Sequence, residues 1–73
     1  MSYRIAVDVG GTFTDLVAVD SAGKVTFVKV PSTPEDQAIG FMDGIARLAE
    51  TLELAVPDLL ADTDQVLHGM TVA

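Results

Sequence analysis

The chain of 73 residues has no cysteine and no tryptophan, and only 4 lysines and arginines stand against 11 aspartates and glutamates. Without cysteine there can be no disulfide and no thiolate metal site, and nothing indicates secretion. The formal net charge of −7 disfavours nucleic acid and anionic membrane as partners. No apolar run approaches the roughly 20 residues of a membrane span, and the first residues lack the layout of a secretory signal. These absences favour a cytoplasmic protein.

The chain is also short for an independent domain, since a chain of this size buries only about 60% of its unfolded surface. Even so, 49% of its residues are hydrophobic and its mean hydropathy is +0.43. Such an apolar composition predicts that residues 1–73 are a single incomplete unit, covered in life by the rest of a parent chain or by a second subunit. Alone, this unit is expected to expose apolar faces and to self-associate.

The most informative stretch is Asp-Val-Gly-Gly-Thr-Phe-Thr-Asp at residues 8–15, which joins two apolar, β-branched runs. These runs predict strands over about residues 3–9 and 13–19, each buried on most of its surface. Gly10 and Gly11 are predicted to form the turn between them. Glycine takes positive φ there without a steric penalty and lets the backbone approach a ligand closely.

The polar residues around this turn predict a phosphate and metal site. Successive N–H groups in a glycine turn form a nest for phosphate oxygens, and the hydroxyls of Thr12 and Thr14 add further donors. Carboxylates would repel polyphosphate directly, so Asp8 and Asp15 are predicted to hold Mg²⁺, or waters bound to it, against the phosphates. A simple hairpin turn is the alternative, but it needs fewer polar and glycine positions. The two common phosphate-loop spacings are excluded because a strand, not a helix, follows.

A third strand is predicted over residues 25–30, after a turn signal at residues 20–23. Short turns make the three strands an antiparallel meander. The lysines of the third strand and the proline that closes it, Pro31, place it near a sheet edge.

A long amphipathic helix is predicted over about residues 34–54, with Thr33 as its N-cap. Gly40 and Gly44 are expected to let it approach the sheet closely. The predicted core-facing residues recur at helical spacing; they are Ala38, Phe41, Met42, Ile45, Leu48, Ala49 and Leu52.

The last segment is predicted to contain a helical turn or loop at residues 56–62 and a brief strand at residues 64–69. The strand ends in a glycine turn and returns parallel to the first strand, which gives a β-β-β-α-β unit of the α/β class. His68, the single imidazole, has two readings. A lone histidine of this kind is more often a structural hydrogen-bonding group, but the end of such a strand is also the usual ligand edge.

Three blocks in order along the chain carry a resemblance. Residues 8–15 resemble the first phosphate loop of the actin, Hsp70 and sugar-kinase ATPases, and with residues 29–34 and 68–73 they resemble the amino terminus of the hydantoinase A/5-oxoprolinase family. The likeness spans nearly the whole chain and departs at Met70, where that family usually has threonine. The resemblance implies a partial ribonuclease H-like, actin-like ATPase fold.

The resemblance further implies the amino-terminal part of an ATP-dependent amidohydrolase. In such an enzyme ATP phosphorylates the amide oxygen of a hydantoin-like or 5-oxoproline-like ring, which water then opens. The expected cofactors are ATP and Mg²⁺, and the expected partners are the nucleotide and a small cyclic amide. Asp8 becomes the expected catalytic residue, and a possible substrate loop includes His68, Gly69 and Thr71.

Two other kinds of function stay open at the level of the sequence. One is a sugar or ketone phosphotransferase, which includes an acetone carboxylase-like subunit that phosphorylates a ketone enolate. The other is a non-catalytic packing or assembly fragment. In either case the 73-residue chain alone is expected to show no ATP hydrolysis, because one phosphate loop supplies half of the superfamily's clamp.

Overall fold

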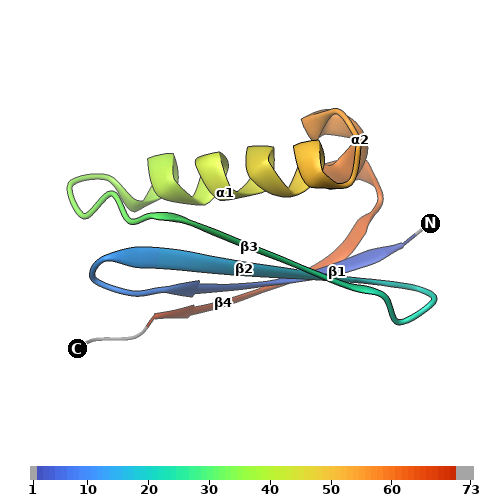
Figure 1. Ribbon diagram of the computed structural model, residues 1–73, viewed down its shortest axis with the longest axis horizontal. Coiled ribbons are helices and arrows are strands. Elements are labelled where there is room, and N and C mark those ends of the chain that lie inside the picture. Colours follow the sequence, from blue (N-terminus) through green and yellow to red (C-terminus); the bar gives the residue numbers. More distant parts are fainter. Residues whose placement is uncertain (1, 71–73) are drawn as a thin grey trace.

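The computed structural model describes residues 2–70, which form one four-stranded sheet with two helices against one of its faces (Figure 1). The elements follow in the order β1 (Tyr3–Val9), β2 (Phe13–Asp20), β3 (Val25–Pro31), α1 (Gln37–Thr51), α2 (Val56–Ala61) and β4 (Thr63–Met70). The predicted α/β class is confirmed. Within the described residues, neither helix has the length and apolar character needed to cross a membrane.

The sheet is mixed, with strand order β3-β2-β1-β4. Strands β1, β2 and β3 are joined by short turns and pair antiparallel, whereas β4 pairs parallel with β1. The parallel return is possible because α1 and α2 carry the chain from one edge of the sheet to the other. Strand β3 lies at an edge, as its lysines and closing proline predicted.

Only one face of the sheet is covered. In β1 the buried residues alternate strictly with exposed ones, which are Arg4, Ala6 and Asp8. The prediction that the first two strands are buried on most of their surface is therefore wrong, because both helices pack on the same face. The covered face and the helices share one core, formed by Tyr3, Ile5, Val7, Val9, Leu16, Ala18, Val28, Val30, Ile45, Leu48, Ala49 and Leu59.

We call the uncovered side of the sheet the open face. Large apolar side chains stand on it, and Val25, Phe27 and Leu67 are 62%, 56% and 57% exposed. These side chains confirm the exposed apolar surface that the composition predicted. Self-association through this surface stays a prediction.

Helix α1 begins three residues later than predicted, at Gln37. Asp36, not Thr33, is its N-cap, because Asp36 has extended backbone and its carboxylate accepts a hydrogen bond from the Ala38 amide at 3.1 Å. The Thr33 hydroxyl instead donates to the Asp36 carbonyl at 2.6 Å and accepts from the Gly40 amide at 2.7 Å. Thr33 thus closes the turn that precedes the helix.

Helix α1 also ends earlier than predicted, at Thr51. Glu53 adopts a positive φ of 59° just past the C-cap. Its amide bonds the Glu50 carbonyl at 3.1 Å and the Leu54 amide bonds the Ala49 carbonyl at 2.8 Å, which is the hydrogen-bond pattern of a Schellman motif. This motif satisfies the last carbonyls and stops the helix.

The buried line of α1 differs from the predicted stripe. Gly40 and Gly44 are buried with Ile45, Leu48 and Ala49, while Met42 is 45% exposed and Ala38 is exposed. The two glycines face the sheet, so the buried side of the helix is centred closer to them than predicted. The prediction that they allow the helix to approach the sheet closely is confirmed. A β-carbon on Gly44 would lie 2.2 Å from Leu16 Cδ1.

Replacing Gly44 by alanine should destabilise the protein. The added methyl group collides with a fully buried Leu16, and overpacking of this kind typically costs about 1–3 kcal/mol. At a separation of 2.2 Å the cost should lie in the upper part of this range, about 2–3 kcal/mol. Alanine recovers about 1 kcal/mol through its helix propensity, so we expect a net loss of roughly 1–2 kcal/mol. Denaturant unfolding measures it, with Asp43→Ala on the exposed side of α1 as the control. An equal or higher stability of Gly44→Ala would contradict this packing.

Candidate functional site

Gly10, Gly11 and Thr12 form the loop between β1 and β2, and the Gly10 amide donates to the Phe13 carbonyl at 3.0 Å. The predicted turn at the glycine pair is confirmed. The pair does not use the positive φ that glycine allows, because the described glycine with positive φ is Gly23, in the next turn. Gly10 is required for another reason. A β-carbon there would lie 3.0 Å from the Phe13 carbonyl oxygen, whereas one on Gly11 would meet nothing within 4 Å.

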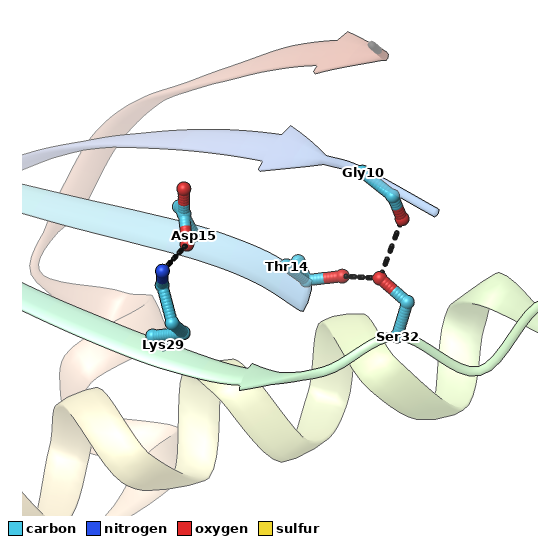
Figure 2. Close-up of polar contacts among 5 residues, drawn as sticks. All are labelled: Gly10, Thr14, Asp15, Lys29 and Ser32. Carbon is cyan, nitrogen blue, oxygen red and sulfur yellow. Dashed lines mark hydrogen bonds and ion pairs between the residues drawn. The ribbon is translucent and has the colours of Figure 1, made fainter. Parts of the chain in front are cut away.

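Ser32 holds this loop from the far end of β3 (Figure 2). Its hydroxyl donates to the Gly10 carbonyl at 2.6 Å and lies 3.0 Å from the Thr14 hydroxyl oxygen. Its amide donates to the Thr12 carbonyl at 2.8 Å. We call these contacts the Ser32 clamp. They connect the loop and the start of β2 with a residue that lies 18 positions after Thr14 and 22 positions after Gly10.

Thr14 lies on the covered face of the sheet and is only 2% exposed. A hydroxyl has one proton to donate, and the Ser32 proton is used on a carbonyl, so Thr14 must be the donor in its bond to Ser32. While the clamp is formed, Thr14 has no proton left for a phosphate oxygen. Its observed role is support of the loop, and its predicted contact with phosphate stays a prediction.

The two predicted metal ligands face each other across the β1–β2 pair. Asp8 and Asp15 are register partners, so their side chains stand on the same face, the open one, with β-carbons about 4.5–5.5 Å apart. Like charges directly opposite in a sheet are destabilising. Such a pair is therefore suited to a bound cation.

Lys29 of β3 continues the same row across the sheet, as the register partner of Asp15. Its ammonium lies 3.9 Å from Asp15 Oδ1 (Figure 2). It also lies 5.1 Å from the centre of the Phe13 ring. The side chains are 50% and 39% exposed, so the ion pair contributes little to stability. Asp15 Oδ1 is itself buried and accepts no hydrogen bond from the described residues. Its observed partner among the described residues is the Lys29 ammonium.

Gly69 completes the row as the β4 partner of Asp8. It has no side chain, so the open face is recessed beside Asp8. The recess is a shallow depression on the open face, lined by Ala6, Val7, Asp8, Asp15, Val17, Leu67, His68 and Gly69. The sheet therefore places both carboxylates in a hollow beside the glycine loop.

His68 and Gly69 lie within β4 and not in a turn, so the predicted glycine turn is wrong at these residues. His68 is the partner of Val7, which is buried against the helices. The imidazole thus belongs to the helix side of the sheet, where it lines a second depression with Gln37, Ala38, Phe41 and Val66. His68 also lines the hollow on the open face, but by register its imidazole stands on the opposite face of the sheet from the two carboxylates. Thr71 lies outside the described residues.

Among the described residues there is no group of three or more histidine, cysteine or acidic side chains that could hold a metal ion. The candidate metal ligands among these residues are the carboxylate pair of Asp8 and Asp15. Sequence reasoning assigned no role in the site to Ser32 or Lys29, and used Lys29 only as a mark of an edge strand. Both residues lie in the block 29–34 that carried the family resemblance, which was the sign that they matter. In the structure Lys29 pairs with Asp15 at the polar end of β2.

The fold and site define a class of protein, namely an α/β unit in which a clamped glycine loop adjoins paired carboxylates on an open sheet face. A model of the hydantoinase/oxoprolinase N-terminal region matches residues 4–73, and the chain belongs to this family.

Two curated relatives align along most of the chain. It is 41% identical over 71 residues to the caprolactamase subunit alpha of Pseudomonas jessenii. The alignment covers 97% of this chain and 10% of the relative. It is 39% identical over 69 residues to the acetophenone carboxylase gamma subunit of Aromatoleum aromaticum, with coverages of 94% and 9%. The chain thus spans about a tenth of the length of these relatives.

Solved structures share the fold. A nucleotide-free acetone carboxylase, described in connection with ATP-dependent acetone carboxylation, superposes with a TM-score of 0.88 at 25% identity, over 96% of this chain and 10% of that one. A diol dehydratase-reactivating factor superposes with a TM-score of 0.67 at 20% identity, over 93% and 12%. The second likeness concerns the fold alone.

Removing the Thr14 hydroxyl should weaken the hairpin. Thr14→Val keeps the shape of the buried side chain and deletes its hydrogen bond to Ser32, so we expect a loss of about 1 kcal/mol in unfolding free energy. Denaturant unfolding measures the loss. Thr26→Val, at a half-buried site of β3, is the matched control and should be neutral. Equal effects of the two changes would show that the buried bond contributes nothing.

Proposed function

We propose that this chain is the amino-terminal region of an ATP-dependent enzyme that activates a carbonyl oxygen of a small cyclic amide by phosphorylation. The observation that carries the proposal is the register pairing of Asp8 with Asp15 on the open face. Their carboxylates meet in a hollow next to the glycine loop. Paired carboxylates beside a backbone loop are what a metal-bound polyphosphate requires.

The site residues fit magnesium. Mg²⁺ is usually held by one or two carboxylates together with substrate phosphates and waters, and this site offers a pair. A cation between Asp8 and Asp15 would relieve their repulsion, and Asp15 Oδ1 accepts no hydrogen bond from the described residues that a metal would have to displace. Lys29, 3.9 Å from that oxygen, would compete with a metal for it, and its positive charge suits the phosphates of the nucleotide.

The loop is the proposed phosphate contact. Gly10, Gly11 and Thr12 form it, and Gly11 and Thr12 are exposed. Thr14 takes part chiefly by holding Ser32. The proposed wider fold is the ribonuclease H-like, actin-like ATPase unit, which the β-β-β-α-α-β order and the likeness to acetone carboxylase support.

In the proposed reaction the amide oxygen attacks the terminal phosphorus of ATP and ADP leaves with the bridging oxygen. Water then adds to the activated carbon, and the ring C–N bond breaks with a proton passing to nitrogen, which leaves an acyl phosphate. A second water hydrolyses the acyl phosphate and gives the open-chain carboxylate and free phosphate. Mg²⁺ supplies charge neutralisation on the phosphates. Asp8 and Asp15 would hold the metal, and the loop amides would orient the phosphates. Gly69, the register partner of Asp8, is a proposed substrate contact, and His68 and Thr71 stay proposed members of a substrate loop.

A second candidate function is ketone activation for carboxylation. It is favoured by the acetophenone carboxylase relative and by the acetone carboxylase structure. Both candidates share the step in which a carbonyl oxygen receives phosphate, so the amino-terminal site is the same. The relatives are named as subunits, which supports the rest of a parent chain or a second subunit as the partner of this region.

Asp8→Asn in the complete enzyme should reduce ATP turnover by about 10²–10³, because the change removes the charge that holds the metal and keeps the size of the side chain. The melting temperature should change little. Steady-state kinetics and thermal unfolding are measured on the same protein. Asp43→Asn, on the exposed side of α1, is the matched control. If Asp8 only supported the turn, stability would fall by about 1 kcal/mol with turnover intact.

The substrate class can be separated by what stimulates ATP turnover in the complete enzyme. The amidohydrolase predicts stimulation by hydantoin, 5-oxoproline or another lactam. Stimulation only by a ketone with bicarbonate would select the carboxylase, and stimulation by hexoses would select a sugar kinase. A complete protein without ATP turnover under all of these conditions would leave the packing fragment as the surviving interpretation.

A further inference from the structure

Ser32 reaches two carbonyls of the glycine loop from outside the hairpin that forms it. Its hydroxyl holds the Gly10 carbonyl at 2.6 Å and its amide holds the Thr12 carbonyl at 2.8 Å. Both carbonyls are therefore turned toward the end of β3, as Figure 2 shows for Gly10. The peptides on either side of the Gly11–Thr12 bond are thus fixed by one residue.

The direction of these carbonyls sets the direction of two amides. In a planar trans peptide the C=O of one residue and the N–H of the next point to opposite sides. The amide of Gly11 is therefore turned away from Ser32, because the Gly10 carbonyl points to it. The same argument turns the amide of Phe13 away, because the Thr12 carbonyl points to Ser32.

The hydroxyl of Ser32 is itself locked. It donates to the Gly10 carbonyl and accepts from Thr14, which is 2% exposed and anchored in the core face of β2. With its donor and acceptor sites both engaged, the hydroxyl has one favourable rotor position. Hydrogen bonds thus run from Thr14 in the core, through Ser32, to the loop. The conformation of the loop therefore depends on the folded sheet as well as on its glycines.

We propose that Ser32 is a positioning residue for nucleotide phosphates, because it fixes the Gly10 and Thr12 carbonyls and so presents the Gly11 and Phe13 amides to the ligand. This role rests on the proposed function. Ser32 touches no reacting atom itself. Its effect is preorganisation, since a loop held by the clamp loses less conformational freedom when phosphate binds.

A merely structural role for Ser32 predicts a different result. A residue that only tied β3 to the hairpin would lower stability when removed and leave nucleotide affinity unchanged. The positioning role predicts weaker nucleotide binding with an almost unchanged rate at saturation. The split between KM and kcat therefore separates the two roles.

The test uses the complete enzyme with three changes. Ser32→Ala deletes the hydroxyl and its bond to the Gly10 carbonyl, and should raise both the Kd and the KM for MgATP about tenfold with kcat altered by less than about twofold. Ser32→Thr keeps the hydroxyl and should restore both constants to within about twofold of the parent protein. Ser21→Ala, an exposed serine in the turn at the other end of the β2–β3 hairpin, is the matched control and should change neither.

A second readout does not depend on ATP. Hydrogen exchange followed by mass spectrometry should show faster exchange of the peptide covering residues 9–14 in Ser32→Ala, and parent-like exchange in Ser32→Thr and Ser21→Ala. Faster exchange in the alanine variant, with no ATP use by the parent protein, would refute the proposed function and leave the clamp as a structural feature. Parent-like MgATP affinity in Ser32→Ala, in an enzyme that does use ATP, would refute the positioning role alone.

Discussion

The register between β1 and β2 is the constraint on which the site depends. Side chains alternate between the faces of a sheet, so a slip of one residue would send Asp8 toward the helices and bring Val7 or Val9 to the open face. A buried carboxylate without a partner is costly, and an apolar core emptied of its valines is costly as well. The core residues Ile5 and Leu16 therefore hold the two carboxylates opposite each other from the covered face of the sheet.

The same alternation divides the end of β2 into two roles. Thr14 faces inward and supports the loop through Ser32, whereas Asp15 faces outward beside Asp8 and Lys29. Neighbouring polar residues that look equivalent in sequence thus belong to different environments. One stabilises the shape of the loop, and the other contributes charge to the hollow that the loop borders.

Family membership and incomplete coverage agree with the shape of the molecule. The chain belongs to the hydantoinase/oxoprolinase N-terminal family and spans about a tenth of its curated relatives. Its sheet is covered on one side only, and large apolar side chains such as Phe27 and Leu67 stand on the other. The proposed chemistry accordingly assigns to this region the first phosphate and metal contacts, and assigns the rest of the active site to further protein.

Much of this architecture follows from local pattern. The bounds of β1 were predicted to the residue, and those of β2 and β3 to within one residue, because alternation and short turn signals act over a few residues. The polar motif between β1 and β2, and the parallel return of β4, were also visible in the sequence. The start of α1 could not be predicted to the residue, because Thr33 and Asp36 are both good N-cap residues. Only their contacts with the Gly40 and Ala38 amides decide between them.

Tertiary structure decided what each polar residue faces. The sequence by itself determined the strands, the long helix and the acidic glycine loop, since periodicity and turn chemistry are encoded within short windows. It did not determine that both helices cover one face, that the loop glycines avoid positive φ, or that His68 lies apart from the carboxylates. Nor did it reveal the Ser32 clamp, because Ser32 and Gly10 are 22 positions apart and meet only when β3 pairs beside β2.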